Sequence, residues 1–185
     1  MRWQQLFADL SAQFEEAVSA EQRADVAARA RTEAASVALA DRLRGSLGGE
    51  VGLECRGAGW VRGRLVDAGA DWALLDDERG GELLVALAAV RVVSGLGRLT
   101  AAPEEGPVRT RLDLRRALRG LARDRSAVRL VLDDGAALSG TIDRVGADFV
   151  ELARHEPDEL RRASAVWEVQ AVAVGAIAVV RAATP

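Results

Sequence analysis

The feature that most constrains the fold of this chain is a passage that occurs twice. Gly63–Leu75 reads GRLVDAGADWALL, and Gly140–Leu152, 77 positions later, reads GTIDRVGADFVEL. The ends of the two copies also match, because Val85–Val93 and Val172–Val180 carry the same residue at five of nine positions. A match that recurs in the same order along the chain predicts a duplicated structural unit.

The pattern within each copy is that of short strands. Along Val128–Leu132 every second residue is Val or Leu, with Arg129 and Val131 between them, as in a half-buried strand, and Asp133–Gly135 is a hairpin signal. Gly63 and Gly140 fall in the middle of the next strand, where a glycine is unfavourable unless the sheet bends or another backbone comes close. Each copy is therefore expected to be a small, strongly bent sheet.

The shared Gly-Ala-Asp sequence predicts the turn into the third strand. We expect Gly69 and Gly146 to let the chain turn, with Gly146 free to take a positive φ angle. Trp72 and Phe149 follow directly, and their strand positions favour core packing over base stacking.

The chain divides by composition into four segments. Residues 1–38 are expected to form an amphipathic helix, with an apolar stripe at Trp3, Phe7, Leu10 and Phe14. That stripe would pack either on this chain or on a partner helix. Residues 39–97 hold the first copy, residues 98–109 have the Pro, Gly and Glu content of a linker, and residues 110–183 hold an Arg-rich helix and the second copy.

The order of elements resembles that of the Sm-like family, the LSm and Hfq type of small β-barrel. The resemblance is carried by LRGLARDRSAVRLVLDDGAALSGTIDRVGADFVEL, residues 118–152, and it extends over residues 39–95 and 112–182. It implies an α+β, mainly β protein. Two tandem five-stranded barrels, each preceded by a short helix, would follow a long N-terminal helix.

The RNA site of that family does not carry over with the fold. Sm-like proteins typically bind single-stranded RNA with an Asp and an Asn in one motif and a basic-Gly pair in another. This sequence contains no Asn, and no Arg-Gly pair closes either copy. Asp71 and Asp148 lie two positions beyond the place where the family's Asp aligns.

Composition argues against catalysis and against a general DNA-coating role. All 25 basic residues are Arg, as expected from a GC-rich genome, and the net charge is −3. The one histidine, His155, lies in a polar segment that predicts a solvated loop, and the one cysteine, Cys55, alternates with apolar residues as a strand residue does. No phosphate-binding loop is present. We therefore expect no enzyme, cofactor, metal or small-molecule substrate.

The one electrostatic anomaly is a run of arginines between Arg109 and Arg125. Arg116, Arg119 and Arg123 are spaced three and four residues apart, so they share one face of a helix. Such a face is either simply solvated or a cationic surface for phosphates or an acidic partner.

These features lead to two functional hypotheses. The first is a non-enzymatic interaction module, an oligomerising scaffold or adaptor, in which the segment 166–172, VWEVQAV, supplies an open edge strand for a protein partner or a second copy. The alternative is single-stranded RNA binding, with a role in RNA metabolism or gene regulation. No apolar run is long enough to span a membrane, and the N-terminus lacks the apolar core of a signal peptide, so a cytoplasmic protein is expected.

Overall fold

The computed structural model describes residues 35, 37–77, 80–100, 112–155, 166 and 168–182. The chain divides into two compact units, Met1–Ala38 and Leu39–Pro185. The helix expected over residues 1–38, including the stripe of Trp3, Phe7, Leu10 and Phe14, lies almost entirely outside the described residues. Every element considered below belongs to the second unit.

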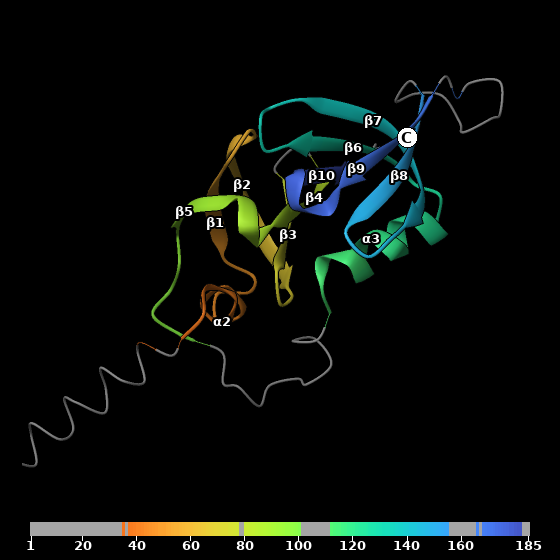
Figure 1. The fold of residues 1–185 in the computed structure, drawn as a ribbon. Coiled ribbons are helices and arrows are strands. Elements are labelled where there is room, and N and C mark those ends of the chain that lie inside the picture. Colours follow the sequence, from red (N-terminus) through yellow and green to blue (C-terminus); the bar gives the residue numbers. More distant parts are fainter. Residues whose placement is uncertain are drawn as a thin grey trace, which may run out of the picture. The chain divides into compact units, whose positions relative to one another are not determined.

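The second unit consists mainly of short strands, with two α-helices and two short 3₁₀ helices among the described residues (Figure 1). In chain order the elements are α2 (Leu39–Arg44), β1 (Glu50–Cys55), β2 (Gly59–Ala68), β3 (Trp72–Asp76), β4 (Glu82–Ala86), η1 (Leu87–Ala89), β5 (Val90–Ser94), α3 (Leu114–Arg123), β6 (Ala127–Leu132), β7 (Ala137–Val145), β8 (Phe149–Arg154), β9 (Glu168–Ala173), η3 (Val174–Ala176) and β10 (Ile177–Ala182).

All ten strands form one open antiparallel sheet. Its order is β5-β1-β2-β3-β4-β10-β6-β7-β8-β9. The predicted fold of two tandem five-stranded closed barrels is therefore wrong. Within the described residues the outer strands of each copy do not pair with each other; instead β4 of the first copy pairs with β10 of the second and joins the two into one sheet.

The two sequence copies correspond to the two halves of this sheet. The order β5-β1-β2-β3-β4 in the first half is the same as β10-β6-β7-β8-β9 in the second. Backbone hydrogen bonds outside the ladders match as well. Leu87 N donates to Asp71 O and Val174 N donates to Asp148 O, both at 2.8 Å. The repeated passage thus specifies the same local structure twice.

Strand and helix formation follows from side-chain patterning and capping. Along β2, alternate residues such as Val61 and Leu65 are buried while the residues between them face solvent. The α3 helix begins after Asp113, whose side chain accepts a hydrogen bond from Arg116 N at 2.9 Å. Leu114 and Leu118 fix its buried face.

The mid-strand glycines are explained by close backbone approach, as expected. A Cβ atom on Gly63 would lie 2.3 Å from the carbonyl oxygen of Asp76, and one on Gly140 would lie 2.2 Å from that of Ala153. The positions are equivalent in the two halves. In both, the absence of a side chain lets the next strand cross closely and the sheet bend.

The turn glycines act differently from the prediction. Neither Gly69 nor Gly146 has a positive φ angle. A Cβ atom on Gly69 would instead lie 2.2 Å from Nε1 of Trp72, and one on Gly146 would lie 2.4 Å from Cε1 of Phe149. The glycines are needed because the aromatic ring that follows folds back over them.

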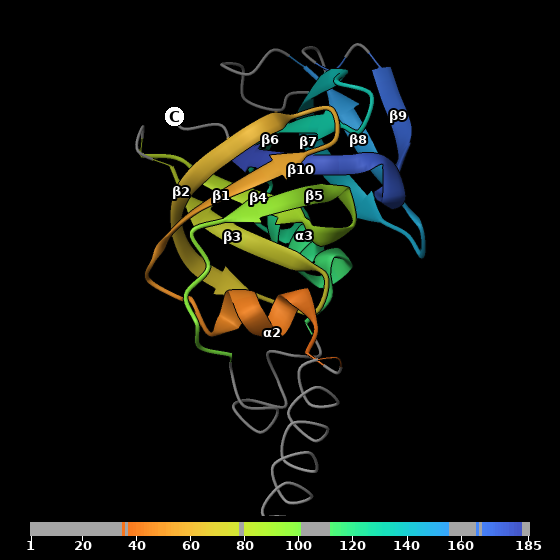
Figure 2. The same ribbon diagram turned by 90° about the vertical axis from the view of Figure 1, so that its left-hand side faces the viewer.

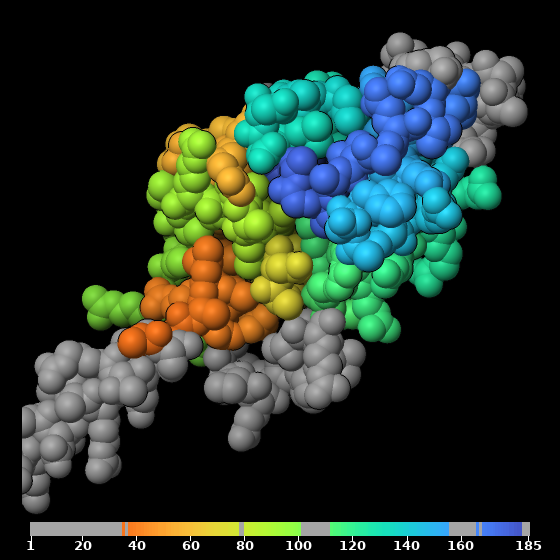
Figure 3. All heavy atoms as spheres, viewed as in Figure 1, coloured from red at the N-terminus to blue at the C-terminus, as the bar shows by residue number. Residues whose placement is uncertain are grey.

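Each half contributes to a hydrophobic cluster of its own, and the clusters are continuous with the shared sheet. The first includes Leu43 of α2 and Leu53, Leu65 and Leu75 from β1, β2 and β3. Figure 2 shows these strands above α2. The second is built mainly from the strands β6 to β10 and α3, and it also includes Trp72, Leu84 and Ala86 of the first half. In the space-filling view of Figure 3 the two halves abut directly.

Candidate functional site: the junction and the open edges of the sheet

The junction between the two halves is a short antiparallel ladder. Val179, Val180 and Arg181 of β10 pair with Val85, Leu84 and Leu83 of β4, respectively. β10 also pairs with β6 on its other side, so it is hydrogen-bonded to both halves. The junction is a continuation of the sheet rather than a contact between two closed surfaces.

Side chains cross this junction in both directions. Ala178 and Val179 belong to the second half by sequence, yet they are fully buried in the cluster of the first half. Conversely, Trp72 and Leu84 of the first half pack in the cluster of the second half. Each core is completed by residues of the other half.

Polar contacts also tie the halves together. Nε1 of Trp72 donates a hydrogen bond to the carbonyl oxygen of Leu112 at 2.8 Å, and Leu114 N at the start of α3 donates to Oδ1 of Asp71 at 2.7 Å. The guanidinium of Arg181 lies 3.6 Å from Oδ2 of Asp77. Trp72 was correctly predicted to be buried, but it lies in the junction rather than within one isolated barrel.

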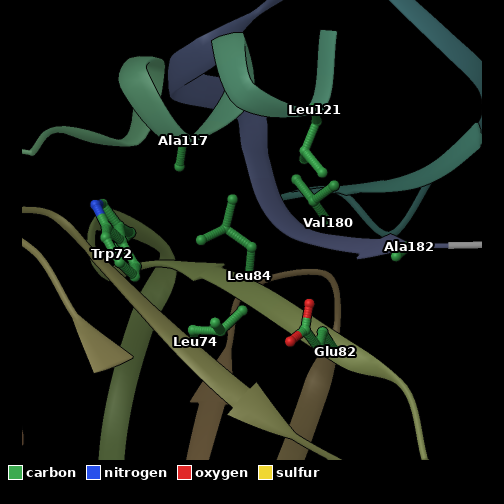
Figure 4. Close-up of a pocket in the computed structure, with 8 residues that line it drawn as sticks. All are labelled: Trp72, Leu74, Glu82, Leu84, Ala117, Leu121, Val180 and Ala182. Atoms are coloured by element: carbon green, nitrogen blue, oxygen red, sulfur yellow. The ribbon is translucent and has the colours of Figure 1, made fainter. Parts of the chain in front are cut away.

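A pocket of about 160 Å³ lies beside the junction (Figure 4). Its walls are almost entirely apolar. Trp72 lies at one end of the paired strands β3 and β4, and the carboxylate of Glu82 lies at the other end. Ala117 and Leu121 of α3 line it from the other side. The pocket is the incompletely filled space between α3 and the strands of the first half.

The two ends of the sheet are open in the described part of the chain. β9 forms one end, as predicted for the segment 166–172, and β5 forms the other. Val92 on β5 is 46% exposed and Val169 on β9 is 57% exposed. An exposed valine beside unpaired backbone groups is the combination that favours pairing with another strand.

A second exposed apolar side chain lies near the β5 end. Trp60 on β2 is 48% exposed, and the guanidinium carbon of Arg62 lies 5.5 Å from its ring centroid. Trp60 and Val92 both pair with Glu54 of β1, from opposite sides, so the three residues form one row across the sheet. The two exposed apolar side chains of this row are therefore separated by the carboxylate-bearing residue Glu54.

The three predicted arginines lie together on α3. Arg116, Arg119 and Arg123 are all exposed. The only ion pair formed by their side chains among the described residues joins Arg123 to Asp124, at 3.4 Å between two well-exposed groups. Such a pair contributes little to stability, so most of this positive charge faces solvent.

The start of α3 has one perturbed carboxylate. The hydrogen bond from the side chain of Arg115 lowers the pKa of Asp113, and the backbone N–H of Arg116 and the nearby charges of Arg115 and Arg119 act in the same direction against a partial burial effect. Because the charged form is favoured, the Asp113 cap stays charged at lower pH than an ordinary aspartate would.

The prediction for His155 is wrong, whereas that for Cys55 is confirmed. His155 is fully buried, and its Nε2 lies 2.8 Å from Oγ1 of Thr141 on the neighbouring strand. Cys55 is a buried residue at the end of β1, and burial together with the charge of Glu54 raises the pKa of its thiol to about 11. Among the described residues, no group of three His, Cys, Asp or Glu side chains could hold a metal ion.

Sequence reasoning missed the junction, although one signal for it exists. At equivalent positions the fourth strand carries Leu83 and Leu84 in the first copy but Gln170 and Ala171 in the second. A strand that is apolar on both faces is typical of a sheet interior, and a partly polar one of an edge. The difference distinguishes β4 from β9.

Comparison with protein-family models finds no match to this sequence, and comparison with curated proteins finds none either. The resemblance to the Sm-like family is therefore not supported, since the family models do not match and the ten strands form one open sheet instead of two closed barrels. No helix in the described ranges is long and apolar enough to cross a membrane.

Proposed function

We propose that this protein is a non-enzymatic scaffold that self-associates through the open edges of its sheet. The observation that carries the proposal is the pair of terminal strands, β5 and β9, each with an unpaired outer edge in the described residues and an exposed valine. Edge strands of this kind bind a further strand through main-chain hydrogen bonds, and side chains on alternate positions add specificity.

Burial on both sides of β4 supports the same proposal. At the junction, where β4 pairs with β10 of the other half, Leu84 and Val85 are buried. The chain thus already contains one strand-to-strand association between two similar units. A scaffold built by repeated strand addition requires no catalytic residue.

Light scattering on the full chain tests this proposal between about 1 μM and about 1 mM, the range of weak assembly contacts. We expect the average mass to increase with concentration. Val169→Lys on the edge strand β9 should reduce that increase, because a lysine on an edge opposes strand pairing. Val66→Lys is the matched control, since Val66 is similarly exposed, at 44%, but lies on the interior strand β2.

A constant monomer mass across this range would contradict the proposal. So would an equal effect of the two substitutions, because that would attribute the change to charge alone.

A second candidate function is the binding of an anionic polymer such as single-stranded RNA. It is favoured by the exposure of Arg116, Arg119 and Arg123 on one face of α3. Three guanidinium groups in a row along a helix face would contact successive phosphates and release counterions.

Fluorescence anisotropy with a labelled oligonucleotide tests this second candidate. The triple change of Arg116, Arg119 and Arg123 to Gln should abolish binding at low salt, and binding by the unaltered chain should decrease by about 0.7 log units per log unit of salt for each phosphate contacted. Arg64→Gln is the control, because Arg64 is exposed but paired with Asp76 at 3.0 Å on β2 and β3. Binding unaffected by salt or by the triple change would exclude this role for α3.

A further inference from the structure

The internal junction shows how two units of this kind join. It is formed by the fourth strand of the first half, β4, and the closing strand of the second half, β10. The ends of the sheet are a fourth strand, β9, and a closing strand, β5. The two open edges are therefore the same two types of edge that meet at the junction.

The sequence match between the copies fixes the equivalent register. Val85–Val93 corresponds to Val172–Val180, so Val85 is equivalent to Val172 and Val92 to Val179. At the junction Val179 pairs with Val85. The equivalent pair between two chains is Val92 of one copy with Val172 of another, and Ser94 then pairs with Gln170.

Core packing favours the same register. At the junction, Ala73, Val85 and Val179 form one row across β3, β4 and β10 within the first cluster, and all three are fully buried. The equivalent row in the second half consists of Val150 and Val172, which pair with each other across β8 and β9. It lacks a third member at the open edge, and the exposed Val92 of a second copy supplies one.

We infer that a second copy of this chain binds at the open edges by repeating the junction, with β9 of one copy pairing antiparallel to β5 of the next. This inference rests on the proposed function and specifies which edges meet. The contact is heterologous, because the two strands come from opposite ends of the sheet. Each copy then pairs with one neighbour through its β9 edge and with another through its β5 edge.

The contact between copies is weaker than the internal junction. Leu84 at the junction is replaced by Ala171 at the open edge, Leu74 by Glu151, and the buried Ala178 by the exposed Arg91. Less apolar area is removed from water as a result. Phe149, the equivalent of Trp72, is only partly buried in the single chain and becomes covered when a second copy binds.

Disulfide trapping tests the register. Residues that pair across an antiparallel ladder are close enough for a disulfide when both are replaced by cysteine. Ser94→Cys and Gln170→Cys are made in separate chains and mixed under oxidising conditions. The native Cys55 does not interfere, because it is buried at the end of β1.

We expect a cross-linked dimer only in the mixture. The control is a mixture of Ser94→Cys with Glu168→Cys. Glu168 lies two residues from Gln170 on the same strand, so this mixture should give no cross-linked dimer. Dimers formed by either single variant alone would show pairing between identical edges and overturn the inference.

Light scattering separates the two possible failures. Association without cross-linking in the Ser94→Cys and Gln170→Cys mixture overturns the register and leaves the proposed self-association intact. Absence of association overturns both.

Discussion

The junction edge of β4 and the open edge of β9 arise from equivalent segments, yet they differ in their surroundings. At β4, Leu84 is covered by the neighbouring strand β10 and by α3. At β9, the equivalent Ala171 is exposed. Both are fourth strands of the repeat, and their side chains differ: the strand with a neighbour carries the larger apolar residue. The comparison shows that a duplicated unit can form either a sheet interior or a sheet edge through changes at a few positions.

The largest expected effect compares the two equivalent valines of the closing strands. Val179→Asp places a charge in the fully buried row of the first cluster, and it should reduce the free energy of unfolding by more than about 4 kcal/mol. Val92→Asp, at the open edge, should change it by less than about 0.5 kcal/mol. Urea denaturation at low protein concentration measures both. Similar losses would show that the β5 edge is already covered in the single chain.

The next effect compares the two aromatic residues that follow the Gly-Ala-Asp turns. Trp72→Ala removes a buried ring and the hydrogen bond to Leu112, so it should destabilise the chain by about 3–5 kcal/mol. Phe149→Ala should cost about 1–2 kcal/mol, because that ring is only partly buried. Thermal unfolding of both variants checks the difference, and an equal cost would break the comparison between junction and edge.

Two glycines should behave alike, because they lie within the halves and away from the edges. Gly63→Ala and Gly140→Ala each place a methyl group against a backbone carbonyl oxygen and should each cost about 2–3 kcal/mol. Gly120→Ala is the control. Nothing lies within 4 Å of its added methyl group, so this helix position should become more stable by about 1 kcal/mol. Chemical denaturation gives all three values, and a neutral Gly140→Ala would show that the halves are not equivalent here.

The smallest effect concerns the two aspartates of the repeated turns. Asp71→Ala removes the acceptor for Leu114 N at the start of α3 and should cost about 1 kcal/mol. Asp148→Ala removes an exposed side chain at the equivalent position and should be neutral to within about 0.5 kcal/mol. A difference in melting temperature between the two variants is the measurement. Equal values would indicate that α3 starts independently of the first half.

Much of the local structure could be predicted from the sequence. The strand predicted at Val128–Leu132, the Asp133–Gly135 hairpin and the close backbone approach at Gly63 and Gly140 are all present. These features depend on neighbouring residues and on the steric properties of glycine. They can therefore be predicted from a few neighbouring residues in the sequence.

The arrangement of the two halves could not be predicted in the same way. Apolar residues on both faces of β4 indicate an interior strand but not which strand pairs with its outer edge, and Val85 and Val179 lie far apart in the chain. The polar residues beside His155 likewise pointed to solvent, whereas a hydrogen bond to Thr141 stabilises it in the interior. The scaffold hypothesis, and the role of Arg116, Arg119 and Arg123 in contacting phosphates or an acidic partner, stay predictions.

One strand, β10, has a consequence for how the chain folds. It contributes Val179 to the first cluster and Ile177 to the second, so neither core is complete until this strand is in place. Its pairing with β4 closes a loop of roughly ninety residues, which is entropically unfavourable, so we expect this pairing to form late in folding. The two halves should therefore fold and unfold in one cooperative transition, limited in rate by the arrival of a single strand.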